Sequence, residues 1–217
     1  MALWLAELNG RARSLNSLYR TGVPRRRIYT EMVDEIITSV RSGARVCACF
    51  YGHPGVFVTP SHEAIARARA EGYPARMFPA ISAEDCLIAD LGVDPGERGW
   101  QSYEATELLL RGHRLDPTAG VVLWQVDAIG KLDWNLEPEP LGLHVLAEHL
   151  LELYPPEHEA VFYLASLYPI AGPTIERVRL DAFAKLREAP GPTLYLPPLP
   201  QPPIDRKVAI RLGLTPS

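Results

Sequence analysis

The stretch Arg45–Phe57, RVCACFYGHPGVF, indicates the fold more strongly than any other part of the chain. Its first half, Arg45–Tyr51, is mostly apolar and predicts a buried strand, because strands covered on both faces read as continuous hydrophobic runs. The second half holds glycine and proline, which predict a tight turn where the backbone approaches a ligand at the strand's carboxyl end. A plain connecting turn explains the second half equally well.

Helical and strand-like patterns alternate along the rest of the chain. Apolar residues at four-residue spacing predict a helix over Ile28–Val40, between Pro24 and Gly43. Ser61 and Ser82 are the expected N-caps of the next two helices. The other expected helices are Glu63–Glu71, Leu87–Leu91, Leu141–Leu153 and Leu180–Arg187, and the other expected strands are Ala75–Phe78, Val121–Val126, Ala160–Ala165 and Thr193–Leu196.

This alternation predicts an α/β fold with substantial parallel pairing of the strands. The Pro- and Gly-containing stretch DPTAG at 116–120 is the best place for a domain boundary. We therefore expect an N-terminal α/β domain over residues 1–117 and a C-terminal α/β domain over residues 118–217.

Composition narrows the class of protein. The chain has 217 residues, of which 47% are hydrophobic and 22% charged, and its net charge is −4. The negative balance argues against a nucleic-acid partner, and no apolar run reaches the ~20 residues of a membrane helix. Cys47 and Cys49 lie in an apolar run, which predicts buried, reduced thiols in a cytoplasmic protein. No His, Cys and carboxylate spacing indicates a bound metal.

Two further elements occupy places where backbone amides can meet a ligand. Residues 81–86, ISAEDC, stand between an expected strand and a helix start, whose free amides can bind oxygens. Gln125 ends the apolar run VVLWQV, where a glutamine is either a satisfied strand-end amide or a ligand contact.

These three elements, in this order, resemble the tetrapyrrole-methylase family of S-adenosylmethionine-dependent methyltransferases, and most of all its borosin-type peptide backbone α-N-methyltransferases. The likeness covers nearly the whole chain and is strongest over Arg25–Pro95, in RRRIYTEM, FYGHPGVFVTPSHEA and ISAEDCLIADLGVDP. It continues through QSYEAT (101–106), LWQV, YLASLYP (163–169) and TLYLPP (193–198).

The resemblance implies two α/β domains of the tetrapyrrole-methylase type, a homodimer, and S-adenosylmethionine as methyl donor with S-adenosylhomocysteine as product. It also implies the residues that contact the donor. Those positions are Tyr51, His53, Pro54, Val56, Phe57, Ser82, Ala83, Gln125, Tyr163 and Leu167.

A set of Tyr19, Arg25 and Tyr29 matches the residues that face the methylated amide in borosin enzymes. The set also suits the chemistry, because an amide nitrogen has a delocalised lone pair and must lose its proton before it attacks a methyl group. Arg25 can stabilise the resulting oxygen as a fixed charge. A tyrosine beside it, with a pKa pulled below ~10, could act as the base.

The sequence also departs from the family. Family members begin with a strand and a glycine-rich loop that this chain lacks, so we expect an incomplete first domain; a naturally short protein, a start codon assigned too late and an engineered truncation are the alternatives. Asn16 replaces one tyrosine of the borosin set, and Ala80 replaces a glycine. The chain stops at Ser217 without the peptide that fused borosin enzymes methylate, so any peptide substrate would come in trans.

Three functions remain open at this point. The first is a methyltransferase acting on a peptide backbone amide or a related small nucleophile. The second is a non-catalytic partner or regulatory protein that binds S-adenosylmethionine or S-adenosylhomocysteine. The third is a tetrapyrrole (precorrin-like) C-methyltransferase, because one fold hosts several activities.

Overall fold

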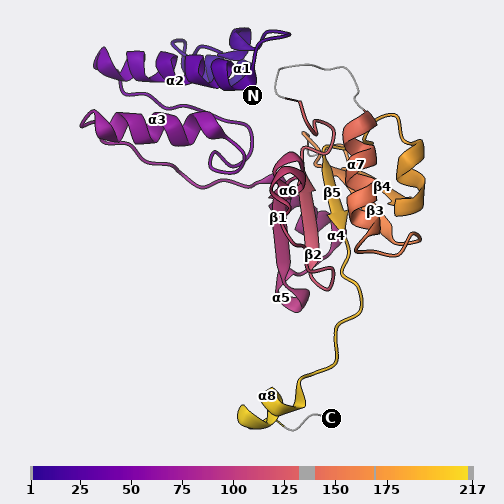
Figure 1. Ribbon diagram of the computed structural model, residues 1–217. Helices are drawn as coiled ribbons and strands as arrows, with labels where there is room; N and C mark the ends of the chain where they lie inside the picture. The colour runs from indigo at the N-terminus through magenta and orange to yellow at the C-terminus, as the bar shows by residue number, and fades with distance from the viewer. Residues whose placement is uncertain (1, 132–139, 169, 215–217) are drawn as a thin grey trace. The chain divides into compact units, whose positions relative to one another are not determined.

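The computed structural model describes residues 2–131, 140–168 and 170–214 (Figure 1). The chain divides into two compact units, Met1–Cys86 with Lys131–Glu137 and Leu87–Gly130 with Pro138–Ser217. The domain boundary expected at 116–120 falls inside the second unit and stays a prediction. No helix within the described ranges is long and apolar enough to cross a bilayer.

The first unit is built on helix α2, Arg25–Arg41, which packs against helix α3, Thr59–Ala70 (Figure 1). Val33 and Ile37 of α2 are buried among small alanines of α3, which let the two helices approach closely. The predicted helix over 28–40 is confirmed. It begins directly after Pro24, whose fixed φ suits a helix start. Helix α1, Ala2–Leu8, and the 3-10 turn η1, Asn16–Leu18, precede it.

The two strands predicted in the first unit are wrong. Residues 45–51 and 75–78 are extended or irregular, and they belong to no sheet. A strand is stable only when a neighbour takes up its backbone hydrogen bonds, and the described part of this unit contains no strand to pair with. For the same reason the prediction of buried cysteines is wrong, since Cys47 and Cys49 are both exposed.

The two predicted serine caps have opposite outcomes. Ser61 is not an N-cap, because it lies inside α3 and its hydroxyl donates to the carbonyl of Val58 (2.8 Å). Ser82 does cap helix α4, Ala83–Leu91. Its hydroxyl accepts the Asp85 amide (3.3 Å), and the Asp85 carboxylate accepts the Ser82 amide (2.7 Å), which makes a reciprocal capping box.

The described residues of the second unit form a five-stranded sheet in the order β1-β2-β5-β3-β4 (Figure 1). Its strands are β1, Trp100–Glu104; β2, Gly120–Trp124; β3, Glu159–Leu164; β4, Thr174–Arg179; and β5, Thr193–Leu196.

Substantial parallel pairing was a wrong expectation for this sheet. Only β1 and β2 pair in parallel, and the other three pairings are antiparallel. Strands β2 and β3 do run in the same direction, as a helical connection requires. They are not neighbours, because β5 lies between them and is antiparallel to both.

Alternate residues of each strand face two different layers. Val121, Leu123 and Phe162 belong to the main core, which helices α6, Ala105–Arg111, and α7, Pro140–Leu151, help to build. The helix expected over 180–187 is the shorter 3-10 turn η2, Leu180–Lys185, on this same core. The opposite face meets α4, where Tyr163 donates its hydroxyl hydrogen to Asp90 (2.6 Å). Two short helices, α5 (Pro95–Arg98) and α8 (Arg206–Arg211), complete the unit.

Candidate functional site

The turn that follows the RVCACFY stretch is tightly closed. Gly52 has a φ of +73°, a conformation that glycine adopts without strain. The carbonyl of His53 accepts the Val56 amide (3.2 Å), and its ring nitrogen Nδ1 accepts the Gly55 amide (2.9 Å). Predicted donor-binding residues from Tyr51 to Phe57 therefore sit on a single ordered loop.

Two residues of helix α3 contact the backbone of this turn. The Ser61 hydroxyl bonds the carbonyl of Pro54, and the His62 Nε2 lies 2.9 Å from the carbonyl oxygen of Gly55. The sequence analysis missed both anchors, assigning a cap to Ser61 and no role to His62. Each contact joins residues seven positions apart, Ser61 with Pro54 and His62 with Gly55. This spacing, across the turn and the first turn of the helix, is the signal that could have predicted them.

The turn lies against the ISAEDC segment. A Cβ built on Gly52 would lie 3.7 Å from the Ile81 carbonyl oxygen, and one on Gly55 would come within 2.8 Å of the Met77 sulfur, so the Met77 side chain packs directly on the turn. The pKa of the Asp85 carboxyl is lowered, chiefly by its hydrogen bonds from Ser82, with a smaller contribution from His53. Two of the three elements that carry the family resemblance are thus adjacent, with Ser82 buried.

Two residues that are not glycine adopt a positive φ in the described part of the chain. They are Phe57 (φ +54°) and Gln125 (φ +57°). Both are among the predicted donor-binding positions. A left-handed conformation costs a residue with a side chain about 1–2 kcal/mol, and such strain gathers at ligand sites.

Tyr19, Arg25 and Tyr29 lie together at the start of α2. Arg25 is the first residue of the helix, Tyr29 is one turn further on, and all three side chains are partly buried. The pKa of Tyr19 is raised, mainly by burial and also by Tyr29, while the nearby Arg25 lowers it by a smaller amount. The expectation that the arginine would lower the net pKa of a tyrosine is therefore wrong for Tyr19, because burial outweighs the attraction.

In the second unit, the predicted residues meet at one edge of the sheet. Trp124, Thr193 and Tyr163 stand in one row across β2, β5 and β3. Gln125 follows the carboxyl end of β2, and Leu167 follows the carboxyl end of β3, where it is exposed. Ligands of α/β proteins bind at such an edge.

Tyr163 has its ring fully buried and its hydroxyl on Asp90, so its side chain is not open to a ligand here. Its main chain meets the loop before β5, where a Cβ on Gly191 would lie 3.0 Å from the Tyr163 carbonyl oxygen. In the same loop, the Pro192 carbonyl accepts a hydrogen bond from the Val126 amide (3.0 Å). This Pro190–Pro192 loop is part of the edge, and the sequence analysis did not assign it.

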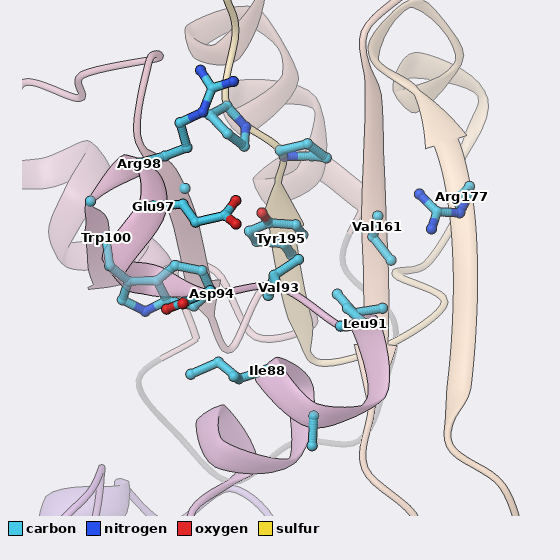
Figure 2. Close-up of a pocket in the computed structure, with 16 residues that line it drawn as sticks. Ile88, Leu91, Val93, Asp94, Glu97, Arg98, Trp100, Val161, Arg177 and Tyr195 are labelled. Carbon is cyan, nitrogen blue, oxygen red and sulfur yellow. The ribbon is translucent and has the colours of Figure 1, made fainter. Parts of the chain in front are cut away.

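A separate cavity of about 560 Å³ lies at the opposite end of β1 and β2. Figure 2 shows Tyr195, Val161 and Glu97 around it. Trp100 stacks on Tyr195 with ring centroids 5.5 Å apart, and Gly120 leaves room for the indole, since a Cβ there would come within 2.8 Å of it. None of the predicted site residues lines this cavity.

No group of three or more His, Cys, Asp or Glu side chains in the described residues is arranged to hold a metal ion. The residues predicted for the site offer backbone amides, the side-chain amide of Gln125, one arginine and two tyrosines, which are groups that hydrogen-bond polar organic ligands.

Comparison with known sequences gives a consistent result. The family model described as tetrapyrrole (corrin/porphyrin) methylases matches residues 7–167. A methyltransferase/type III borosin cyclic peptide precursor of Anomoporia bombycina is 41% identical over 205 residues, which cover 92% of this chain and 24% of that protein. A type I borosin precursor of Coprinopsis marcescibilis is 42% identical over 192 residues, 85% of this chain and 49% of that protein. The chain spans about a quarter to a half of the length of these relatives.

Solved structures share the fold. The uroporphyrin-III C-methyltransferase of Thermus thermophilus, complexed with S-adenosyl homocysteine, matches with a TM-score of 0.53 and 17% identity, over 77% of this chain and 69% of that chain. A cobalt precorrin-4 methyltransferase matches with a TM-score of 0.55 and 11% identity, over 78% of this chain and 70% of that chain.

Proposed function

The chain belongs to the tetrapyrrole (corrin/porphyrin) methylase family, and on that premise we propose that it is an S-adenosylmethionine-dependent methyltransferase. Its proposed substrate is the backbone amide of a peptide, or a related small nucleophile. The names of the relatives support this choice, since they join a methyltransferase to a borosin cyclic peptide precursor.

The observation that carries the proposal is the left-handed backbone at Phe57 and Gln125. The two residues lie in different units, and both are among the donor-binding positions that the sequence predicts. Strain at a residue with a side chain persists where the surroundings enforce it, and binding sites are the commonest such places. Its coincidence with two predicted contacts therefore supports the donor-binding assignment of each residue.

The residues present fit a nucleoside-bearing donor. The start of α4 at Ala83 offers helix-terminal amides for a carboxylate or hydroxyl oxygen. Gln125 supplies a side-chain amide, whose NH2 group donates hydrogen bonds and whose oxygen accepts them. When bound, S-adenosylmethionine supplies a methyl group activated by its positive sulfur.

The catalytic roles follow from the set at the start of α2. Arg25 hydrogen-bonds the oxygen of the substrate amide and stabilises the negative charge that develops there when the N–H proton leaves. We assign that proton to Tyr29 as base. Tyr19 takes the orienting role, because burial raises its pKa and keeps its hydroxyl protonated as a donor.

The assembly we propose is a homodimer in the cytoplasm. Cys47, Cys49 and Cys86 form no disulfide, which suits a reducing compartment. Light scattering after size exclusion tests the dimer directly. A monomer at micromolar concentration would contradict it.

The function is tested by titrating the protein calorimetrically with S-adenosylhomocysteine, and by incubating it with S-adenosylmethionine and unstructured apolar peptides. We expect micromolar binding of the product and methylated backbone amides by fragmentation mass spectrometry. Arg25→Ala should lower transfer about 100-fold without changing product affinity, whereas Arg26→Ala, a neighbouring exposed arginine, should leave it unchanged. Binding without transfer to any peptide would favour the non-catalytic partner; methylation of a tetrapyrrole instead would favour the C-methyltransferase.

A further inference from the structure

Tyr19 lies on a short segment that has little structure of its own. It follows η1, and the local backbone bonds are its own amide to the Asn16 carbonyl (3.1 Å) and the Val23 amide to the Arg20 carbonyl (3.2 Å). Backbone turns of this kind leave a segment with many conformations. A side-chain attachment to α2 helps to hold Tyr19 beside Arg25 and Tyr29.

The residue next to Tyr19 supplies that attachment. The guanidinium of Arg20 pairs with Oε2 of Glu31, which projects from α2. The other oxygen of the same carboxylate, Oε1, accepts Nε of Arg27 (3.2 Å). Glu31 therefore uses both oxygens at once, which fixes the orientation of its carboxylate.

Glu31 is the best shielded member of this group. Its side chain is 28% exposed, against 46% for Arg20 and 73% for Arg27. An ion pair of this kind loses less to solvent screening than a fully exposed one. Because Arg20 is adjacent to Tyr19 in the chain, holding the Arg20 side chain on α2 also holds the Tyr19 backbone there.

We propose that Glu31 is a positioning residue, which through Arg20 fastens Tyr19 against α2 in reach of Arg25 and Tyr29. The role of Tyr19 itself rests on the proposed function. Glu31 does not touch the reacting atoms in this arrangement. It determines whether the orienting hydroxyl is present where the substrate amide binds.

The same helix offers a matched control. Glu35, one turn further along α2, pairs with Arg13 at 3.1 Å and so also ties the preceding chain to the helix. Arg13 additionally donates to the Ser39 hydroxyl (2.7 Å). This second attachment lies six residues before Tyr19, so its loss should free a different part of the chain.

The test compares Glu31→Gln with Glu35→Gln in the full chain. We expect Glu31→Gln to lower kcat for peptide methylation about tenfold with little change in KM, and Glu35→Gln to stay within about twofold of the wild type. Arg20→Ala should match Glu31→Gln. The double variant Arg20→Ala/Glu31→Gln should lower kcat no further than either single substitution, because both substitutions remove the same contact.

A spectroscopic readout separates positioning from general loss of structure. With tyrosine labelled at Cζ, and Tyr19→Phe used to assign its signal, the titration midpoint of Tyr19 should move toward 10 in Glu31→Gln, since a released tyrosine loses the burial that raises its pKa. It should not move in Glu35→Gln. Affinity for S-adenosylhomocysteine should be the same in all variants.

Equal behaviour of the two glutamine variants, or an unmoved Tyr19 signal in Glu31→Gln, would overturn the proposal. If the wild type methylates nothing, the proposed function fails, while the Tyr19 titration still decides whether Glu31 positions it. If Glu31→Gln does not fold, Arg20→Ala carries the same two readouts, because it leaves Glu31 paired with Arg27.

Discussion

Two apolar runs of similar composition adopt different structures in this chain. Residues 120–124, GVVLW, are strand β2 and every one of them is buried. Residues 45–51, RVCACFY, form no strand, and Val46 is 40% exposed. β2 has β1 on one side and β5 on the other, whereas the described residues around 45–51 include no strand. Apolar composition therefore makes a segment suitable for a sheet, but the segment becomes a strand only where neighbouring strands are available to pair with it.

The strongest test of this contrast is the same substitution in both units. Phe162→Ala removes a fully buried ring that packs on Phe183 at 5.2 Å, and should cost about 3–5 kcal/mol of unfolding free energy. Phe78→Ala removes a ring that is 61% exposed and lies under the Arg76 guanidinium, and should cost less than about 1 kcal/mol. Urea unfolding measures both. Equal losses would mean that Phe78 is covered in solution.

A smaller effect is expected where the second unit holds strain. Gln125→Gly removes the left-handed conformation of a residue with a side chain, and should stabilise the protein by about 1 kcal/mol while weakening S-adenosylhomocysteine binding. Gln125→Ala is the control: it also loses the amide but keeps the strain, so binding should fall without the gain in stability. Calorimetry and urea unfolding report the two quantities. A stabilised variant with unchanged affinity would remove Gln125 from the donor site.

The pH dependence of stability should come partly from the second unit. Burial lowers the pKa of His158 below 6.5, despite opposing contributions from the Pro197 backbone and Glu159. The unfolded chain therefore binds this proton more readily, so the contribution of His158 is full above pH ~6.5 and declines as the pH falls. In His158→Gln, the urea midpoint should depend less on pH between pH 7.5 and 5.5. A slope that is the same in His158→Gln and the wild type would contradict this contribution.

The smallest effect is expected at the surface of the first unit. Arg41 and Glu71 pair at 2.6 Å between α2 and the end of α3, and this hydrogen-bonded pair lowers the pKa of Glu71. The pair stabilises the fold above the ordinary carboxyl pKa and stops doing so as the pH falls through the lowered value. Glu71→Gln should lower the Tm slightly at low salt and not at 1 M salt. A large, salt-independent loss would show that the pair is not a screened surface contact.

The parts of the fold that sequence patterns predicted are those with two buried faces. Strand β5 was expected over Thr193–Leu196 and lies there, and β2 and β3 were expected within one or two residues. Both strands that went unpredicted, β1 and β4, are the edges of the sheet. An edge strand such as TIERVR is largely exposed and reads as polar, so its apolar signal is weak.

The candidate site was predictable to a different degree. The turn at Tyr51–Phe57 and the cap at Ser82 came from local motifs, and the structure places these two elements together. The roles of Tyr19, Arg25 and Tyr29 came from family resemblance and remain predictions. Their attachment through Glu31 was not predictable, because the Arg20–Glu31 pair depends on how an irregular segment returns to a helix.

The position of β5 has a consequence for synthesis of the protein. This strand follows the other four in the sequence, yet it is the central strand of the sheet and separates β2 from β3. A nascent chain that has not yet released β5 from the ribosome would hold β1 and β2 apart from β3 and β4, with two open edges and no strand to join them. The sheet can therefore be completed only after β5 has been synthesised, and until then its exposed edges are surfaces for chaperones to protect.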